Sequence, residues 1–571
     1  MCPKRHTGEE RFSRSALFLN IFSIHRLLTA AAALVLTAAP AAGAVYQWSA
    51  PVRGALSAET YDNPRAYLWI PPACPRVRAV VVGEHNLLEE PLLESPRLRA
   101  RLEKLCIAEV WTTPVLDTTF DFNNGAGAVF TGMMQDLADA SGYAELAYAP
   151  VVPVGESALA SYPWNFAAWA PERTLAVISL KGDAPQTDMT GSGKPNPDWG
   201  ARTLDGVPGL MIMGEYEWLE GRLAPALAYE KAHPKTPLSL YADPGHGHFD
   251  LSDPLIDYIG LFIEKAAQAR LPAKGPLNAP PRLLPVDPAR GWRADRWRFD
   301  AAPAAPAAPD ASYKGPRDDS FWYFDAAMAR LAEAHYAETR GKAPQLIGFV
   351  QDGRVVPQSD NHAQVELAFA PQADGVSFRL DARMLDAVPG GNANLSRWTR
   401  LPVGAPLGHA DGPIEITRET GPVVRTGPDT WRVDFNRVGF NNARRGGDVW
   451  FVATQGGDAR YKSAVQQALL HVPLFNTRGA AQSIRFEAPA RVSLSRSGGA
   501  LKLSATATSG LPVRFYVQDG PAEIDGGVLR FTPIPMRARL PIRVTVIAWQ
   551  YGVAGQTQSA TPVERTLLLT R

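Results

Sequence analysis

Three short segments of the sequence carry residues that could act together as a nucleophile, an acid and a base. Ser157 lies in the segment GESA, directly after the apolar run of residues 150–154. Small residues around a serine at a strand-to-helix turn are typical of a nucleophile turn, because the strained backbone there leaves little room. At the start of the following helix, the N–H of Ala158 would help to hold an oxyanion. The pattern predicts that Ser157 is a nucleophile.

A nucleophilic serine needs a base and a group that orients the base, and in chains with this turn they follow in the order serine, acid, histidine. Residues 210–213 lead into the segment GEYE, which places Glu215 and Glu217 at the end of a predicted strand. Residues 238–241 lead into DPGHGHFD, a loop that contains His246 and His248 and precedes a helical stretch. The order and spacing therefore predict that an acid and a base follow Ser157.

The segments VGESALA, IMGEYE and DPGHGHFD resemble the α/β-hydrolase superfamily, and the resemblance covers about residues 45–270. It implies that Ser157 is the nucleophile, Glu217 the acid and His248 the base, with Glu215 as the alternative acid. It also implies hydrolysis of an ester, amide or thioester without a metal or another cofactor. Two positions depart from the usual pattern: Leu159 stands where G-x-S-x-G has its last glycine, and the acid is Glu rather than Asp.

A second oxyanion donor is expected in the loop after the third strand of such a fold. That loop is Gly83-Glu84-His85-Asn86, so a backbone N–H near His85 or Asn86 is predicted to contact the substrate. The alternative is that the two side chains only brace the loop. His246 and His248 form an H-x-H pair that could bind a metal, but no third or fourth ligand is evident, so no metal site is predicted.

Buried strands alternate with helices over residues 45–270, which predicts a doubly wound, mostly parallel sheet covered on both faces. The expected strands are residues 77–82, 106–113, 150–154, 175–180, 209–213 and 238–241, and the expected helices are residues 89–104, 129–141, 157–169 and 255–268. These elements would bring Ser157, the acid and the base to one edge of the sheet.

The composition and the predicted secondary structure change after residue 270. Residues 271–316 are rich in Pro and Ala and predict an extended linker. Short alternating strands predict an all-β sandwich over residues 317–478. Residues 479–571 resemble bacterial immunoglobulin-like modules, most specifically at SGLPV. Such modules usually space or attach an enzyme, and the resemblance implies no chemistry for them.

The N-terminus predicts export. Residues 1–26 are net positive, residues 27–39 are apolar, and Ala42-Gly43-Ala44 suits cleavage after Ala44, so residues 1–44 read as a signal peptide. A transmembrane anchor or an amphipathic helix is the alternative. A secreted or periplasmic protein would meet an oxidising environment, where Cys74 and Cys106 could pair or remain two buried thiols.

Composition excludes some classes of protein. The 571 residues carry a net charge of +1 without a basic block, which argues against a nucleic-acid partner. After signal cleavage no run of 18 apolar residues remains, so no transmembrane anchor is expected. The leading interpretation is an exported serine esterase that acts on esters, including those of polysaccharides or other polymers. Alternatives are a polyester depolymerase or peptidase with the same triad, or a non-catalytic surface- or polymer-binding protein with a decayed hydrolase domain.

Overall fold

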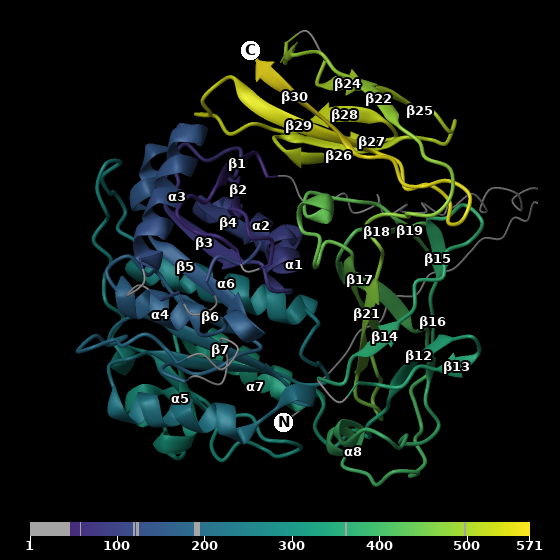
Figure 1. Ribbon diagram of the computed structural model, residues 1–571. Helices are drawn as coiled ribbons and strands as arrows, with labels where there is room; N and C mark the ends of the chain where they lie inside the picture. The colour runs from purple at the N-terminus through teal and green to yellow at the C-terminus, as the bar shows by residue number, and fades with distance from the viewer. Residues whose placement is uncertain are drawn as a thin grey trace, which may run out of the picture. The chain divides into compact units, whose positions relative to one another are not determined.

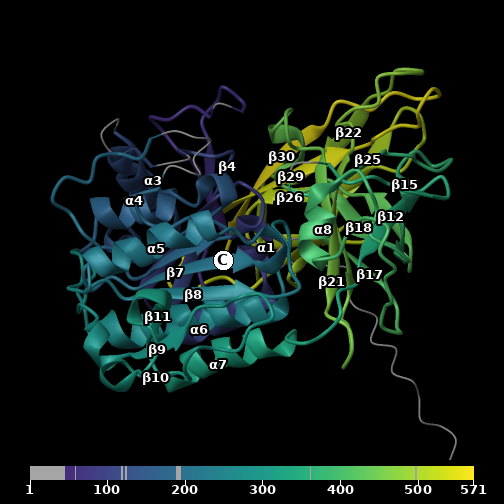
Figure 2. The same cartoon turned by 90° about the horizontal axis from the view of Figure 1, so that it is seen from below.

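The computed structural model describes residues 46–571 except Ala58 and residues 118–119, 122–124, 188–194, 360–361 and 496–497. Figures 1 and 2 show these residues from two directions. The expected signal peptide of residues 1–44 lies outside the described residues. Within the described part of the chain, no helix combines the length and the apolar character that crossing a bilayer requires.

An eight-stranded sheet forms the core of the α/β domain (residues 46–271), with the strand order β1-β2-β4-β3-β5-β6-β7-β8. Its strands are β1 (Trp48–Pro51), β2 (Arg65–Trp69), β3 (Ala79–Glu84), β4 (Ile107–Thr113), β5 (Val151–Glu156), β6 (Val177–Leu180), β7 (Gly209–Gly214) and β8 (Leu238–Asp243). The pairs β1–β2 and β2–β4 are antiparallel and the remaining pairs are parallel. Every residue of β3 to β8 is buried, as expected for parallel strands covered on both faces.

Helices cover both faces of this sheet (Figures 1 and 2). They are α1 (Glu89–Glu94), α2 (Pro96–Leu105), α3 (Ala126–Ser141), α4 (Tyr162–Trp169), α5 (Glu220–Ala232) and α6 (Asp253–Arg270). Helix α2 pairs with α6 through Arg101 and Glu264 (2.7 Å), while α3 contacts α4 through the rings of Phe130 and Phe166. The doubly wound, mostly parallel sheet expected from the sequence is therefore present.

The structure differs from the sequence-based expectation at several elements. The helix expected over residues 89–104 is divided at Ser95, which caps α2 by accepting the N–H of Leu98, and Pro96 begins the new helix. A proline cannot continue a helix from the preceding turn but suits the first position of the next one. The expectation also lacked β1, β2 and α5; α5 contains Pro225 inside the helix, which weakens its helical pattern.

The expected linker of residues 271–316 contains folded segments in the structure. Strands β9 (Trp292–Asp295), β10 (Ala308–Pro309) and β11 (Ser320–Tyr323) form a small sheet, and α7 (Ala326–Glu338) follows it. The Ser239 hydroxyl of β8 donates to the Trp322 carbonyl (2.6 Å), and the Tyr323 hydroxyl donates to the Leu240 carbonyl (2.8 Å). Buried aromatic residues thus bind residues 291–338 to β8, although the Pro and Ala content of the first half predicts an extended chain.

The middle β region (residues 343–475) consists of three small sheets and one short helix. Its elements are β12 (Ile347–Gln351), β13 (Arg354–Val355), β14 (Val365–Leu367), β15 (Ser377–Arg379), β16 (Asp381–Met384), α8 (Ala393–Thr399), β17 (Glu415–Thr420), β18 (Val423–Arg425), β19 (Thr430–Val433), β20 (Asp448–Gln455) and β21 (Ala464–His471). The largest sheet has the order β14-β21-β20-β17. This β-rich character agrees with the alternating pattern of the sequence.

The C-terminal β region (residues 484–570) also forms three sheets. Its strands are β22 (Ile484–Glu487), β23 (Arg491–Ser493), β24 (Ala500–Lys502), β25 (Ser504–Ala507), β26 (Arg514–Asp519), β27 (Ala522–Asp525), β28 (Val528–Phe531), β29 (Ile542–Trp549) and β30 (Val563–Thr570). Its Arg537 pairs with Glu145 of the α/β domain (3.0 Å). The region therefore packs against the α/β domain through specific polar contacts.

A disulfide joins Cys74 to Cys106, the pairing that the sequence left open. It links the segment before β3 to the end of α2, across a sequence separation of 32 residues. The Tyr143 hydroxyl donates to the Cys74 carbonyl (3.1 Å) and accepts the N–H of Arg537 (3.1 Å). The disulfide thus lies beside the contact with the C-terminal β region.

Candidate active site

Ser157 occupies a sharp turn between β5 and α4. It begins a short 3-10 turn, Ser157–Leu159, and its backbone has φ +51°, a left-handed conformation that is strained for serine. Gly155 is required just before it, because a Cβ there would lie 2.2 Å from the carbonyl oxygen of Leu159. Leu159 itself is buried, and the close approach that the usual last glycine would allow is instead made by Ala160 and Gly182. The local sequence therefore holds the serine in the geometry of a nucleophile turn.

The structure brings the predicted nucleophile, base and acid into one chain of hydrogen bonds. The Nε2 atom of His248 lies 2.7 Å from the Oγ of Ser157, and its Nδ1 atom bonds to the carboxylate of Glu217. The His248 side chain is 1% exposed, whereas Ser157 is half-buried. A base that contacts both the hydroxyl and an orienting carboxylate is the arrangement needed for proton transfer.

Glu217 is held as an anion beside His248. Its other oxygen accepts the N–H of Gly214 (3.0 Å), and Arg222 lies 3.2 Å from the oxygen that bonds His248. Burial by itself would raise the pKa of Glu217, but His248, followed by Lys181 and Arg222, lowers that pKa to about 2. The carboxylate is therefore ionised across the physiological range and can stabilise a protonated imidazole.

The alternative acid, Glu215, points away from His248. One of its oxygens pairs with Lys462 of the middle β region (2.9 Å), and the other accepts the N–H of Gly245 (2.8 Å). Both charged side chains are nearly inaccessible to solvent, at 2% for Glu215 and 5% for Lys462. Of the two candidate acids, Glu217 is the one that contacts the base.

The expected second oxyanion donor is not placed as the sequence predicted. The N–H of His85 donates to the Thr112 carbonyl (2.7 Å), and the N–H of Asn86 donates to the Glu89 carboxylate (3.2 Å). The His85 ring bonds to Thr113 and the Asn86 side chain donates to Glu156, so these side chains brace their loop. The N–H of Ala158, in the first turn after Ser157, has no acceptor within its own helix and remains the expected donor.

Two buried carboxyl groups behind the nucleophile were not singled out from the sequence. Glu156 is fully buried, and its Oε1 lies 3.7 Å from the Nε2 of His248. The carboxylate of Glu89 accepts the N–H of Glu156 (2.7 Å). Burial, and then the charge of Glu89, raise the pKa of Glu156 well above its usual value, which favours its neutral form. A neutral Glu156 leaves Glu217 as the carboxylate that pairs with His248.

The loop that carries His248 rests on a buried cluster of charges. His246 bonds to Asp250, and Asp243 lies behind them with Lys181 at 3.4 Å and His335 at 3.0 Å. Burial would lower the pKa of His246, but Asp243 and Asp250 raise it to about 9. His246 is thus bonded as a cation in the loop. In the residues that the structure describes, no three or more His, Cys, Asp or Glu side chains are grouped to hold a metal.

The middle β region contacts the loops that carry Glu217 and His248. Beyond the Lys462–Glu215 pair, Gln467 of β21 donates to Asp250 (3.0 Å), and the Trp398 indole donates to the Tyr216 carbonyl. The sequence does not show these contacts, because the contacting residues lie about 180 to 250 positions further along the chain. One local signal exists: Gln466 and Gln467 are adjacent polar residues in an otherwise apolar strand, and both are buried.

His362 is the contact of the middle β region that lies closest to the predicted base. Its ring stacks on the ring of His248 with the centroids 4.1 Å apart and an interplanar angle of 7°. Phe249 contacts both rings, at 4.5 Å from His248 and 5.4 Å from His362. Sequence reasoning did not find His362, because nothing near it marks a catalytic loop.

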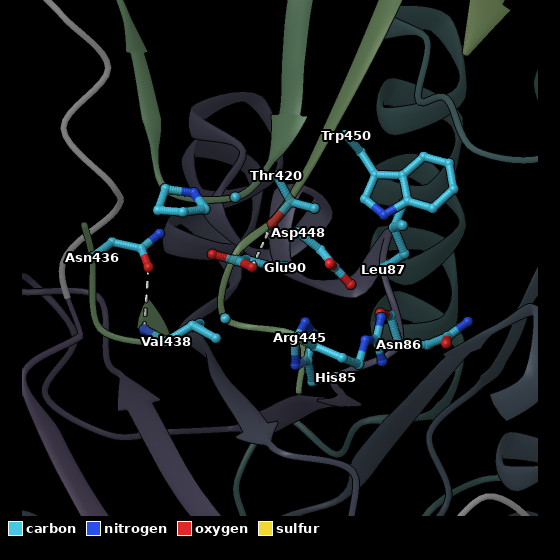
Figure 3. A pocket seen from close by; sticks show the side chains of 13 residues that line it. His85, Asn86, Leu87, Glu90, Thr420, Asn436, Val438, Arg445, Asp448 and Trp450 are labelled. Carbon is cyan, nitrogen blue, oxygen red and sulfur yellow. Dashed lines mark hydrogen bonds between the residues drawn. The ribbon is translucent and has the colours of Figure 1, made fainter. Parts of the chain in front are cut away.

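A small cavity lies between the loop after β3 and the middle β region (Figure 3). Across it, the Thr420 hydroxyl donates to Glu90 (2.7 Å), and Arg445 lies near His85. Trp450 borders the cavity, and its ring lies 4.4 Å from Phe249. The cavity is lined by His85, Asn86, Leu87, Glu90, Thr420, Gly421, Pro422, Asn436, Val438, Arg445, Gly446, Asp448 and Trp450. Phe249 therefore lies between Trp450, at the border of the cavity, and His248.

Comparison with known proteins gives similarity in structure but not in sequence. No protein-family model matches the chain, and no curated protein matches it. A dienelactone hydrolase from Anabaena variabilis is 19% identical with a TM-score of 0.26, over 41% of this chain and 99% of that protein. An S-formylglutathione hydrolase from Agrobacterium tumefaciens is 14% identical with a TM-score of 0.27, over 39% and 93% of the two chains. A poly(3-hydroxybutyrate) depolymerase from Bordetella parapertussis is 12% identical with a TM-score of 0.26, over 40% and 92%.

The fold assignment follows from the chain itself. Strands β3 to β8 are parallel in the order β4-β3-β5-β6-β7-β8, β1 and β2 add an antiparallel edge, and a strained serine turn follows β5. The loops after β7 and β8 carry Glu217 and His248, which bond to each other, and His248 also bonds to Ser157. Residues 46–271 have the α/β-hydrolase fold.

Proposed function

We propose that the protein is a serine hydrolase of carboxylic esters in which Ser157 is the nucleophile, His248 the base and Glu217 the orienting acid. The observation that carries the proposal is the 2.7 Å contact between the His248 Nε2 and the Ser157 Oγ, with Glu217 bonded to the opposite ring nitrogen. The strained backbone of Ser157 supports the same assignment, because such strain is typical of functional positions.

In the proposed reaction, the Ser157 Oγ attacks the acyl carbonyl while His248 accepts the hydroxyl proton at Nε2. The N–H of Ala158 donates to the oxyanion that forms. His248 then gives its proton to the departing alcohol, which leaves an acyl group on Ser157. Water attacks this acyl-enzyme with His248 again as the base, and release of the acid restores Ser157. Glu217 remains ionised throughout, in keeping with its lowered pKa.

The substrate class that we favour is a small, soluble ester. The side chains of His362 and Phe249 contact the catalytic imidazole, Trp450 packs against Phe249, and Ser157 is half-buried. A covered nucleophile suits a short acyl chain better than the surface of a solid polyester or a folded polypeptide. We further propose that the protein is exported, since the Cys74–Cys106 disulfide is a feature of oxidising compartments.

The test compares hydrolysis of p-nitrophenyl acetate and butyrate by the full chain, its Ser157→Ala variant and the control Ser312→Ala, which changes an exposed serine. We expect Ser157→Ala to lower kcat about 10⁶-fold, and Ser312→Ala to match the wild type. A fluorophosphonate probe should label the wild type at Ser157. Equal hydrolysis by wild type and Ser157→Ala would overturn the triad. Absence of both hydrolysis and labelling in a folded wild type would favour a non-catalytic binding protein.

A further inference from the structure

His362, the histidine of the middle β region that contacts His248, lies in a strained backbone segment. His362 and Ala363 both have left-handed backbone conformations, with φ +51° and +58°. Two consecutive non-glycine residues in the left-handed conformation are uncommon, because the Cβ atom crowds the backbone there. Ala363 is fully buried, and its carbonyl accepts a hydrogen bond from Gln466 of β21 (2.9 Å). The fold therefore holds a strained segment in place, and that segment presents His362 to the α/β domain.

The contact between the two rings is flat and close. At a centroid distance of 4.1 Å and an angle of 7°, the His362 ring covers one face of the His248 ring. Phe249 meets the His248 ring with an edge contact at 73°. Ser157 and Glu217 bond the two nitrogen atoms of His248. A face contact on the ring leaves both of these nitrogen bonds intact.

We propose that His362 is a positioning residue for the base: its ring holds the His248 imidazole in plane between Ser157 and Glu217 and keeps water off the covered face. The proposal rests on the proposed function for its kinetic consequences. It assigns to the middle β region a part in the reaction, in place of the spacing or attachment expected of appended β modules.

The charges around the two rings are compatible with this role. Burial, and then the neighbouring His248, lower the pKa of His362 to about 4. Of the other charged groups that act on it, Glu217 opposes this shift, whereas Arg222 of α5 and Arg397 of α8 contribute to it. Glu156 faces His248 from β5. His362 is therefore neutral near pH 7, so a proton accepted by His248 does not place two positive rings face to face.

The cover also has a geometric reason. An imidazole that loses its alignment by about 1 Å loses much of its effect as a base, because proton transfer needs both partners within hydrogen-bond distance. The hydrogen bond from Glu217 to Nδ1 holds one edge of the His248 ring. A single hydrogen bond does not prevent the ring from rotating about that contact. A flat ring against the face of the imidazole opposes this rotation. A ring of similar shape should replace His362, whereas a small side chain should not.

The kinetic test compares His362→Ala, His362→Phe and the control His409→Ala, which removes an exposed histidine of the same region. We expect His362→Ala to lower kcat about 10- to 100-fold with KM changed by less than about threefold, since the substrate still binds at Ser157. His362→Phe should retain kcat within about threefold because it restores the flat cover. His409→Ala should match the wild type. A kcat for His362→Ala equal to the wild type, or a His362→Phe variant as slow as His362→Ala, would overturn the proposal.

A second measurement does not depend on turnover. Exchange of the C2 hydrogen of individual histidines for deuterium, followed by mass spectrometry, reports how far water reaches each ring. We expect exchange at His248 to be faster in His362→Ala than in wild type and to remain slow in His362→Phe. Exchange at His335, buried against Asp243, serves as the internal reference for folding. Unchanged exchange at His248 in a folded His362→Ala protein would overturn the cover, even if the protein hydrolyses no ester. If His362→Ala does not fold, His362→Asn provides the same comparison with His362→Phe.

Discussion

The middle and C-terminal β regions are both built from short strands in three small sheets, yet they contact different parts of the α/β domain. The middle region contacts the loops that leave β7 and β8, through Lys462, Gln467 and Trp398. The C-terminal region contacts strand β1 and the segments that lead into β3 and β5. Ligands of open α/β sheets bind outside the carboxyl ends of the strands. The position of a β region, and not its strand content, therefore decides whether it can influence chemistry.

The chemistry of the two contacts differs as well. The Lys462–Glu215 pair is almost fully buried, and Glu215 is two residues from the proposed acid. Arg537, which makes the corresponding contact of the C-terminal region with Glu145, is 36% exposed, while Glu145 is 3% exposed. A buried pair leaves an uncompensated charge when one partner is removed, whereas water can reach and solvate a partly exposed site. The comparison predicts that breaking the ion pair of the middle β region lowers stability more than breaking that of the C-terminal β region. It also predicts that only the first change lowers turnover.

The largest expected effect is that of Lys462→Met. Removing the ammonium leaves the Glu215 carboxylate buried without its partner, which should lower the free energy of unfolding by about 3–5 kcal/mol. It should also lower kcat, because Glu215 accepts the N–H of Gly245 in the histidine loop. The matched variant Arg537→Met should lower the free energy of unfolding by only about 1 kcal/mol and leave kcat unchanged. Denaturant unfolding followed by tryptophan fluorescence, with ester hydrolysis on the same samples, measures both quantities.

Two results would break the comparison. One is an Arg537→Met protein whose kcat falls as far as that of Lys462→Met. The other is a Lys462→Met protein that keeps wild-type kcat and stability, which would mean that Glu215 is neutral or solvated without its lysine. Either result would show that the two β regions act on the α/β domain in the same way.

A smaller effect is expected from pH. His246 gains Asp250 and Asp243 as partners on folding, and its pKa is about 9 in the folded protein, against about 6.5 when unfolded. Its contribution to stability is therefore complete below about pH 6.5 and is lost as the pH rises to about 9. Within this window one extra bound proton gives a slope of about −1.4 kcal/mol per pH unit. The variant His246→Gln should lose this component of the slope in denaturant unfolding.

The control for this pH effect lies in the other β region. Residues 484–571 contain no histidine, so Arg537→Met should keep the wild-type dependence on pH between 6.5 and 9. Gln467 binds the same Asp250 that holds His246, so the middle β region is the one coupled to this titration. An unchanged slope in His246→Gln would mean that His246 is not a cation in the folded protein.

The sequence predicted the α/β domain better than the regions around it, and the reason is physical. Buried parallel strands are continuous apolar runs, and a strand that ends in Gly-x-Ser requires small neighbours, so both features are local. Ser157, Glu217 and His248 follow in a fixed order along these strands, and the structure brings them together.

The remaining features depend on contacts between distant residues, which a local pattern does not contain. The N–H groups of His85 and Asn86 looked available, but Thr112 and Glu89 accept them once the loop is folded. The Pro- and Ala-rich stretch predicted a linker. In the structure this stretch packs against the α/β domain through Trp297, which is 4% exposed, and its neighbours. His362 reaches His248 from more than a hundred positions away.

The smallest expected effect sharpens the comparison with two tryptophans of the β regions. The indole of Trp398 in α8 donates to the carbonyl of Tyr216 in the acid loop and stacks on the Tyr216 ring at 4.6 Å. The indole of Trp549 in β29 is also buried, but its N–H has no hydrogen-bond partner among the described residues. Substitution of either tryptophan by phenylalanine makes the side chain smaller and removes the indole N–H. The two substitutions therefore differ mainly in the hydrogen bond to the acid loop, which only Trp398 makes.

We expect Trp398→Phe to lower kcat a few-fold and to cost about 1 kcal/mol for the lost hydrogen bond, in addition to the loss of packing. Arg397 also donates to the Tyr216 carbonyl (3.2 Å), which keeps that oxygen bonded and limits the effect. Trp549→Phe loses packing but no hydrogen bond, so kcat should be unchanged. Steady-state kinetics of both variants at one pH provides the measurement. If Trp549→Phe lowered kcat as much as Trp398→Phe, packing alone would explain both effects, and the link from α8 to the acid loop would have no separate role in turnover.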